Sequence, residues 1–302
     1  METVELGRLP NGLAVLMDAE AMEADGIVVI NRIKPHTSFS GRIESGILKM
    51  LTIGLGKQAG ADACHRLGMG TMGQNILDMS EIKLARSPVL FGVGTVENSY
   101  DRICRVAVVP APEILEREAE LLVEARTNMP RIMFNPLDAL MVDLMGKEYS
   151  GTGMDPNITG RAGTPYVKTE LKAARLVILD LSDKTKGNAT GVGLADICTR
   201  RLFERIDFDA TYMNHITSTV LPGAKIPLMM DSDLRAVQCA IKTCNATDMD
   251  RLRIVRIPNT LHLETLMISD ALLPEARENA RIEVLDEPVD WAFDASGTLA
   301  AF

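Results

Sequence analysis

Aromatic residues are scarce in this sequence: they make up 4% of its 302 residues, with a single tryptophan. The five cysteines form no C-x-x-C pair, and their odd number is typical of reduced thiols rather than of a disulfide framework. No apolar run is long enough to span a bilayer, and the chain does not open on a signal-peptide pattern. These absences favour a soluble, cytoplasmic protein without a membrane partner.

An excess of positive charge is also missing. The net charge is -9 and the pI is about 5.1, so nucleic acid is not an expected partner. Hydrophobic residues amount to 46% and include 17 methionines, which predicts an aliphatic core filled in part by methionine. The length suits two domains, and the oligomeric state is left open.

Short apolar runs alternate with helical patterns along the chain, and no internal repeat is present. This rhythm predicts an α/β fold with two α/β domains, mostly parallel or mixed sheets, and the site at the interdomain cleft. We place a cofactor-binding domain at residues 1–150 and a C-terminal α/β domain that closes the cleft at residues 151–302. The turn-rich segment 149–157 suits a linker or a binding loop. A closing strand is predicted at residues 282–285.

Two of the four histidines fall in one stretch, residues 30–66. The β-branched run at residues 25–30 predicts a buried strand of the parallel-sheet kind. Pro35 cannot serve a central strand, so the chain should leave the sheet there in a loop that carries His36. Ligands of open α/β sheets bind at the carboxyl ends of the strands, which makes His36 a candidate site residue.

A helical pattern follows, with apolar residues spaced i, i+4, i+7 and i+8 from Ile43. Ser45 and Lys49 lie one turn apart on another face of that predicted helix. A second helix is predicted at residues 58–66 and carries His65. Each of these polar residues, taken singly, is more often solvated or structural, so the prediction of a site depends on their combination.

Three glycines, Gly68, Gly70 and Gly73, satisfy the G-x-G-x-x-G pattern of dinucleotide-binding loops. That pattern requires a strand before it, whereas a predicted helix precedes it here. We therefore predict an ordinary loop at residues 68–73 and no dinucleotide site.

The sequence S-G-I-L-K at residues 45–49 matches the S-G-x-x-K motif of the lactate racemase (LarA) family of nickel-pincer-nucleotide-dependent racemases and epimerases. The segments RIKPHTSF, ESGILKM and IGLGK, and later SGTGMDPN, GNATGVGLAD and GAKIP, are similar to an uncharacterised branch of that family. The resemblance implies that Lys49 holds the cofactor covalently and that Ser45 and Gly46 belong to the cofactor site.

The same resemblance implies that His65 ligates nickel and that His36 is a catalytic acid or base. Imidazole suits both roles, because it titrates near neutral pH and is a good nickel ligand. The implied enzyme is an isomerase that racemises or epimerises a 2-hydroxy acid by hydride transfer to and from the cofactor. That cofactor is a nickel-bearing pyridinium thioamide/thiocarboxylate mononucleotide, so cofactor-biosynthesis proteins are expected as partners.

Family members carry a long segment ahead of this region that holds a second acid/base histidine, whereas no histidine precedes His36 here. We therefore expect either a fragment or a shortened form that lacks the family's N-terminal segment. The second hypothesis is a catalytically incomplete protein that binds nickel or the cofactor without turnover. A third is a metal-independent lyase or isomerase that uses Lys49 as a Schiff-base amine.

Overall fold

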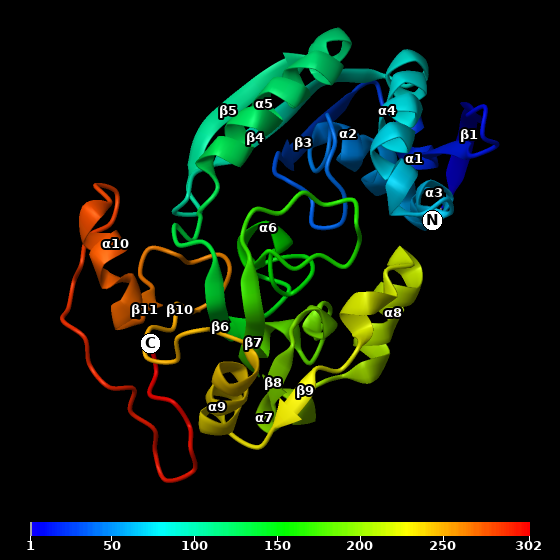
Figure 1. Ribbon diagram of the computed structural model, residues 1–302. Helices are drawn as coiled ribbons and strands as arrows, with labels where there is room; N and C mark the ends of the chain where they lie inside the picture. Colours follow the sequence, from blue (N-terminus) through cyan, green and yellow to red (C-terminus); the bar gives the residue numbers. More distant parts are fainter. Residues whose placement is uncertain (1) are drawn as a thin grey trace. The chain divides into compact units, whose positions relative to one another are not determined.

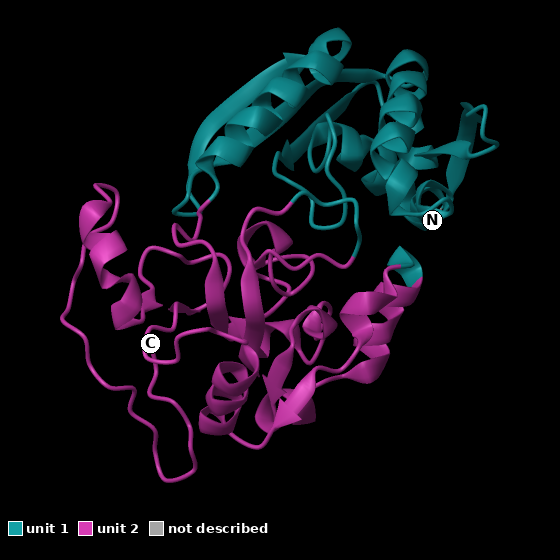
Figure 2. Cartoon of the chain, in the orientation of Figure 1, with its two compact units in different colours: residues 1–129, 164–168, 217–219 teal, residues 130–163, 169–216, 220–302 magenta. Residues whose placement is uncertain are grey.

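The computed structural model describes residues 2–302, which form a mixed α/β protein with two compact units (Figure 2). The first unit comprises residues 1–129, 164–168 and 217–219, and the rest of the chain forms the second unit. The predicted α/β class with parallel and mixed sheets is confirmed. The main segment of the first unit ends before the boundary that we placed at residue 150, because strand β6 (Leu137–Met145) pairs within the sheet of the second unit. The placement of a site at an interdomain cleft stays a prediction.

The first unit contains a three-stranded sheet in the order β3-β4-β5, in which β3 is parallel to β4 and β4 is antiparallel to β5. The predicted strand at residues 25–30 is confirmed as β3, but it is buried on one face only: Val29 is 3% exposed and Ile30 is 64% exposed. The strands of this unit are β1 (Thr3–Arg8) and β2 (Ala14–Asp18), which form a separate hairpin, and β3 (Ile27–Arg32), β4 (Val89–Glu97) and β5 (Ile103–Pro110).

Helix α5 packs along β4 and β5, as Figure 1 shows. The helix predicted from Ile43 begins only at Ile47, because Ser45 is held in extended conformation by two backbone hydrogen bonds with Lys34. After Lys49 the chain continues without a break into a π-helical turn, Met50–Gly54. The helices of this unit are α1 (Ala19–Met22), α2 (Ile47–Lys49), α3 (Lys57–His65), α4 (Met69–Arg86) and α5 (Ile114–Asn128).

The loop predicted at residues 68–73 is wrong, because helix α4 begins at Met69. Glycines are poor helix formers, but tertiary packing overrides that preference here. A Cβ atom on Gly70 would lie 2.8 Å from the ring of Tyr166, and one on Gly73 would lie 3.6 Å from the ring of Phe39. The two glycines therefore allow aromatic rings to pack against the first turns of α4.

The second unit contains a six-stranded sheet in the order β11-β10-β6-β7-β8-β9, in which only β11 is antiparallel to its neighbour. No strand forms at residues 282–285, so that prediction is wrong. The strands are β6, β7 (Ala173–Leu181), β8 (Ile197–Thr199), β9 (Leu228–Met230), β10 (Ile254–Ile257) and β11 (Met267–Ile268). The helices are α6 (Pro156–Thr159), α7 (Arg200–Glu204), α8 (Phe208–Ser218), α9 (Asp233–Thr243) and α10 (Leu273–Glu278).

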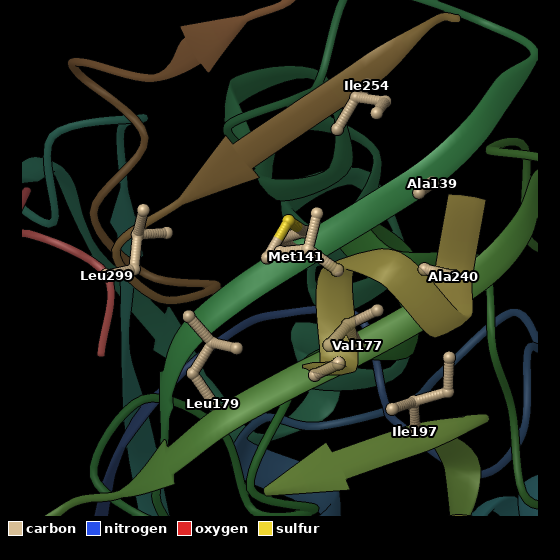
Figure 3. Packing of buried hydrophobic residues seen from close by; sticks show 10 residues of the cluster. Ala139, Met141, Val177, Leu179, Ile197, Ala240, Ile254 and Leu299 are labelled. Atoms are coloured by element: carbon tan, nitrogen blue, oxygen red, sulfur yellow. The ribbon is translucent and has the colours of Figure 1, made fainter. Parts of the chain in front are cut away.

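Aliphatic side chains of β6 and β7 form the centre of this unit's core, and Ala240 of α9 packs against them (Figure 3). Both strands are buried along most of their length, as expected for a parallel sheet covered on both faces. All five cysteines are free thiols. Within residues 2–302, no helix combines the length and the apolar character needed to cross a membrane.

Candidate active site

The loop after β3 carries His36 and is shaped by a buried carboxylate. Glu44 is 1% exposed. Its Oε2 accepts a hydrogen bond from the backbone N–H of His36, and its Oε1 accepts one from the N–H of Gly41, both at 2.7 Å. Arg126 of α5 also pairs with this carboxylate, which compensates its charge. Glu44 thus closes the loop on itself and ties it to α5, and His36 is held in a defined position.

Lys49 and His36, both predicted site residues, are in direct contact: Lys49 Nζ lies 2.8 Å from His36 Nε2. The other ring nitrogen, Nδ1, accepts a hydrogen bond of 3.0 Å from the backbone N–H of Ser38. A neutral imidazole that accepts at Nδ1 carries its proton on Nε2. That Nε2–H can bond to Lys49 only if the amine offers a lone pair, so both contacts are satisfied together in the fraction of molecules in which Lys49 is neutral.

The electrostatics of the site increase the neutral fraction of Lys49. Burial, with a smaller contribution from the charge of Lys34, lowers the pKa of Lys49 to about 8, against an opposing effect of Cys64. Burial also lowers the pKa of His36 well below its usual value, and the charges of Lys49, His65 and Lys34 add to this effect. The charge of Lys34 makes the surroundings of Lys49 and His36 positive, which suits a small anion such as a carboxylate.

His65 lies at the end of α3, as predicted. Its Nδ1 lies 2.7 Å from the carbonyl oxygen of Ala61, one turn earlier, and can only donate to that oxygen. The neutral ring then has its lone pair on Nε2, and a backbone carbonyl behind the ring is the usual way in which a metal-ligating histidine is oriented. Residues 2–302 contain no group of three or more His, Cys, Asp or Glu side chains that could hold a metal.

The remaining predicted residues, Ser45 and Gly46, lie just before α2. Ser45 pairs with Lys34 through the backbone. Gly46 packs against the carboxylate of Glu118 from α5, where a Cβ atom would come within 2.3 Å of Oε1. Glu118 is 1% exposed, and its Oε2 accepts a 2.9 Å hydrogen bond from the N–H of Leu48. In this structure Gly46 therefore makes room for the carboxylate that caps the turn carrying Lys49.

Replacing Gly46 by Ala should destabilise the protein by about 1–3 kcal/mol, because the new methyl group displaces a buried carboxylate. The free energy of unfolding measured in urea would test this. Gly151→Ala is the matched control, since a Cβ there meets nothing within 4 Å. An equal effect of the two substitutions would contradict the packing role of Gly46.

Glu118 also predicts a pH-dependent stability. Burial raises its pKa from 4.5 to about 7, so the unfolded chain releases this proton at lower pH than the folded chain. The contribution of Glu118 to stability is then complete below about pH 4.5 and falls by up to about 3 kcal/mol as the pH rises to about 7. Urea unfolding of the natural protein and of Glu118→Gln at pH 5 and pH 8 would measure this. The difference between the two proteins should change with pH, and a constant difference would refute the assignment.

Three buried charges, Glu44, Lys83 and Glu118, were missed by the sequence analysis. For two of them a signal existed. Lys83 continues the buried series Met72, Ile76 and Met79 on α4, and Glu118 stands four residues after the buried Ile114. A charged residue at a core position of a helical pattern indicates a buried partner.

A cavity of about 370 Å³ lies in the first unit, near this site. Phe39, which stacks on the ring of His36 at a centroid distance of 4.4 Å, forms part of its wall. Its polar lining comes from Ser40, Arg42, Gln74, Tyr166 and Lys168. His36, Lys49 and His65 do not line it, so the cavity is a neighbour of the candidate site rather than the site itself.

The other two histidines belong to the second unit. His215 is 4% exposed; its Nδ1 lies 2.6 Å from the carbonyl oxygen of Val220, and its Nε2 accepts from the N–H of Gly191. His262 contacts the side chain of Asn259. Both ring nitrogens of His215 are thus engaged within its own unit, which indicates a structural role.

No protein-family model matches this chain, and no curated protein sequence matches it. Among solved structures, it is similar to a Thermotoga maritima protein determined by a structural genomics consortium, with 14% identity and a TM-score of 0.46 over 86% of this chain and 74% of that one. It is also similar to the lactate racemase apoprotein of Thermoanaerobacterium thermosaccharolyticum, with 15% identity and a TM-score of 0.43 over 86% of this chain and 67% of that one. At these identities the chemistry has to be argued from this chain's own side chains.

Proposed function

We propose that this protein is a racemase or epimerase of a 2-hydroxy acid that holds a nickel-pincer nucleotide covalently through Lys49. The observation that carries the proposal is the contact of Lys49 with His36, which is satisfied when the amine is neutral. An amine forms a covalent bond only through its lone pair, and an ordinary lysine is protonated at neutral pH. The charge of Lys34 beside Lys49 also suits an anionic substrate.

The side chains fit the cofactor in two respects. Lys49 offers a nucleophilic nitrogen, and His65 offers an Nε2 lone pair oriented by the carbonyl of Ala61. When bound, the cofactor would supply a hydride acceptor and a nickel ion that needs an imidazole as its remaining ligand. The protein supplies attachment, orientation and proton transfer.

His36 is the candidate proton carrier, and its hydrogen bonds define what it can do first. With Nδ1 accepting from Ser38, the ring presents Nε2–H, so it can donate a proton or a hydrogen bond to a substrate oxygen. To act as a base at Nε2, the ring must protonate Nδ1 and give up the contact with the Ser38 N–H. We therefore expect the acid role to need no rearrangement and the base role to need a local movement of residues 36–38.

The test is the intact mass of the denatured protein together with its nickel content, after co-expression with the enzymes that make the cofactor. We expect a nucleotide-sized adduct and bound nickel. Lys49→Ala should lose the adduct, and His65→Ala should keep the adduct but lose nickel. Lys168→Ala is the matched control, because Lys168 is an exposed lysine of the same unit. An adduct that persists in Lys49→Ala would refute the proposed attachment.

One observation favours the second candidate, a cofactor-binding protein without turnover. Within the described part of the first unit, His36 and His65 are the only histidines, whereas inversion by two acid/base histidines would require one more. The loaded protein would then carry adduct and nickel but fail to interconvert the two enantiomers of any 2-hydroxy acid. A Schiff-base lysine is distinguished by borohydride trapping with a keto acid, which would mark Lys49 without any cofactor.

A further inference from the structure

Two buried, oppositely charged side chains close the two ends of the helical turn that carries Lys49. We propose that Glu118 and Lys83 are positioning residues that hold the helical segment 47–54, made of α2 with Lys49 and of the π-turn Met50–Gly54 that follows it, and thereby keep the amine of Lys49 against His36. The inference rests on the proposed function of Lys49 as a nucleophile. It concerns neither the cofactor nor the substrate directly.

Glu118 acts at the beginning of the turn. The first N–H groups of a helix have no partner within the helix, and a carboxylate there also complements the helix dipole. Glu118 Oε2 accepts the N–H of Leu48, the residue immediately before Lys49. Because Gly46 has no side chain, the carboxylate can approach the backbone closely at this point.

Lys83 acts at the other end. Its Nζ donates to the carbonyl oxygens of Leu51 at 2.9 Å and of Thr52 at 3.1 Å. The turn is closed by a hydrogen bond from the N–H of Leu55 to the carbonyl of Met50, five residues earlier, rather than by the four-residue spacing of an α-helix. Such a turn leaves carbonyls without their regular partners, and Lys83 supplies these partners from α4.

The form of the turn decides where Lys49 points. A π-turn contains one residue more than an α-turn, and one residue corresponds to a rotation of about 100° about the helix axis. Lys49 directly precedes the π-turn and α3 follows it. If the π-turn relaxed to a regular α-helix, Lys49 would rotate relative to α3 by about that angle. The contact with His36 on the separate loop after β3 would then be lost. Fixing both ends of the turn prevents this relaxation.

A purely structural role would be served better by apolar residues. Both side chains are 1% exposed. Burial raises the pKa of Glu118 to about 7 and lowers that of Lys83 to about 8, so the ionised form of each is disfavoured where it stands. Replacing buried charges by packed apolar groups is often neutral or stabilising. Two such charges on either side of one reactive lysine indicate that they serve its position.

The experiment measures the rate at which acetic anhydride modifies Lys49 as a function of pH, read by mass spectrometry of the Lys49 peptide. The natural protein should give a midpoint near pH 8. Lys83→Met and Glu118→Ala should each move that midpoint upward by about one unit or more, because a displaced Lys49 becomes hydrated. Glu118→Gln keeps an acceptor for the N–H of Leu48, so its midpoint should lie close to that of the natural protein.

Two controls separate position from stability. Arg86→Met on α4 and Glu120→Gln on α5 remove exposed charges near the same positions and should leave the midpoint unchanged. The groups that act on Lys49, which are Lys34, Cys64 and the contacting His36, stay the same in every variant. If Lys83→Met does not fold, Lys83→Gln retains one donor for the turn.

The results separate the two proposals. A natural protein with a midpoint near 10.5 would refute the nucleophilic role of Lys49 and this inference with it. A midpoint near 8 that stays there in folded Lys83→Met and Glu118→Ala would overturn the inference alone. A loss of thermal stability without a shift of the midpoint counts as the second outcome, because it shows a merely structural role.

Discussion

Replacing Arg256 by Met should lower the free energy of unfolding of the second unit by about 3–5 kcal/mol. The Arg256 side chain is 3% exposed, and its Nε and Nη2 donate to the two carboxylate oxygens of Asp143 at 2.8 and 2.7 Å. Nη2 also donates to the carbonyl of Ala300 near the end of the chain. Without the guanidinium, Asp143 is left as a partly buried carboxylate without its partner, and burial already raises its pKa. Urea unfolding followed by circular dichroism would measure the loss.

Two further variants show whether the cost arises from the unpartnered charge. Arg256→Met combined with Asp143→Leu removes both charges, and it should recover most of the lost stability, because an apolar pair replaces the ion pair. Arg277→Met removes a guanidinium that is 55% exposed and pairs with Glu287, so it should cost under about 1 kcal/mol. A double variant as unstable as the single one would contradict the explanation.

The elements that position the candidate site could be predicted because their signals are local. The β-branched run of β3, the proline after it and the spacing of apolar residues placed His36 in a strand-end loop and His65 on a helix. Alternation of short runs also predicted the α/β class. Each of these features is determined by residues within about ten positions along the chain, so a single sequence is enough to predict it.

The partners of the buried charges could not be predicted, because they are distant in the chain. Glu118 caps Leu48 from 70 residues away, and Arg256 pairs with Asp143 over 113 residues. A helical pattern can place a charged residue at a core position, as for Lys83 and Glu118, but it does not show which group that residue contacts. For the same reason the prediction of a helix from Ile43 was wrong. The backbone of Ser45 pairs with that of Lys34, which prevents a helical conformation there.

The sequence pattern identified Lys49 and His36 as candidate site residues. It did not predict that they are in contact, nor which protonation state each of them has. His36 lies on a loop and Lys49 on a helical turn 13 residues later, and their contact depends on how these two elements pack. The tautomer of His36 follows from one backbone N–H, that of Ser38. Side-chain identity therefore suggests a chemistry, while the hydrogen bonds decide which form of each group is present.

That form has a measurable consequence: at pH 7, Lys49 should react with acetic anhydride on the order of 100-fold faster than an ordinary exposed lysine of the same protein. With a pKa of about 8, roughly a tenth of its amine is neutral at pH 7, whereas an amine of pKa 10.5 is neutral to a few parts in ten thousand. The lower basicity of Lys49 also reduces the nucleophilicity of its neutral amine, so the expected difference in labelling rate is about two orders of magnitude. Quantitative mass spectrometry of the lysine peptides, with Lys168 as the internal reference, would measure the ratio.

The charge of Lys34 provides a second arm of this prediction. Lys34 lowers the pKa of Lys49 by repulsion, so Lys34→Met should raise that pKa and slow the labelling of Lys49 at pH 7 by several-fold. The rate above pH 10 should be nearly unchanged, because the amine is neutral there in both proteins. Equal rates at pH 7 would mean that burial alone sets the reactivity. A Lys49 that reacts like Lys168 at every pH would show that the amine is protonated, and the pairing with His36 would then have to be abandoned.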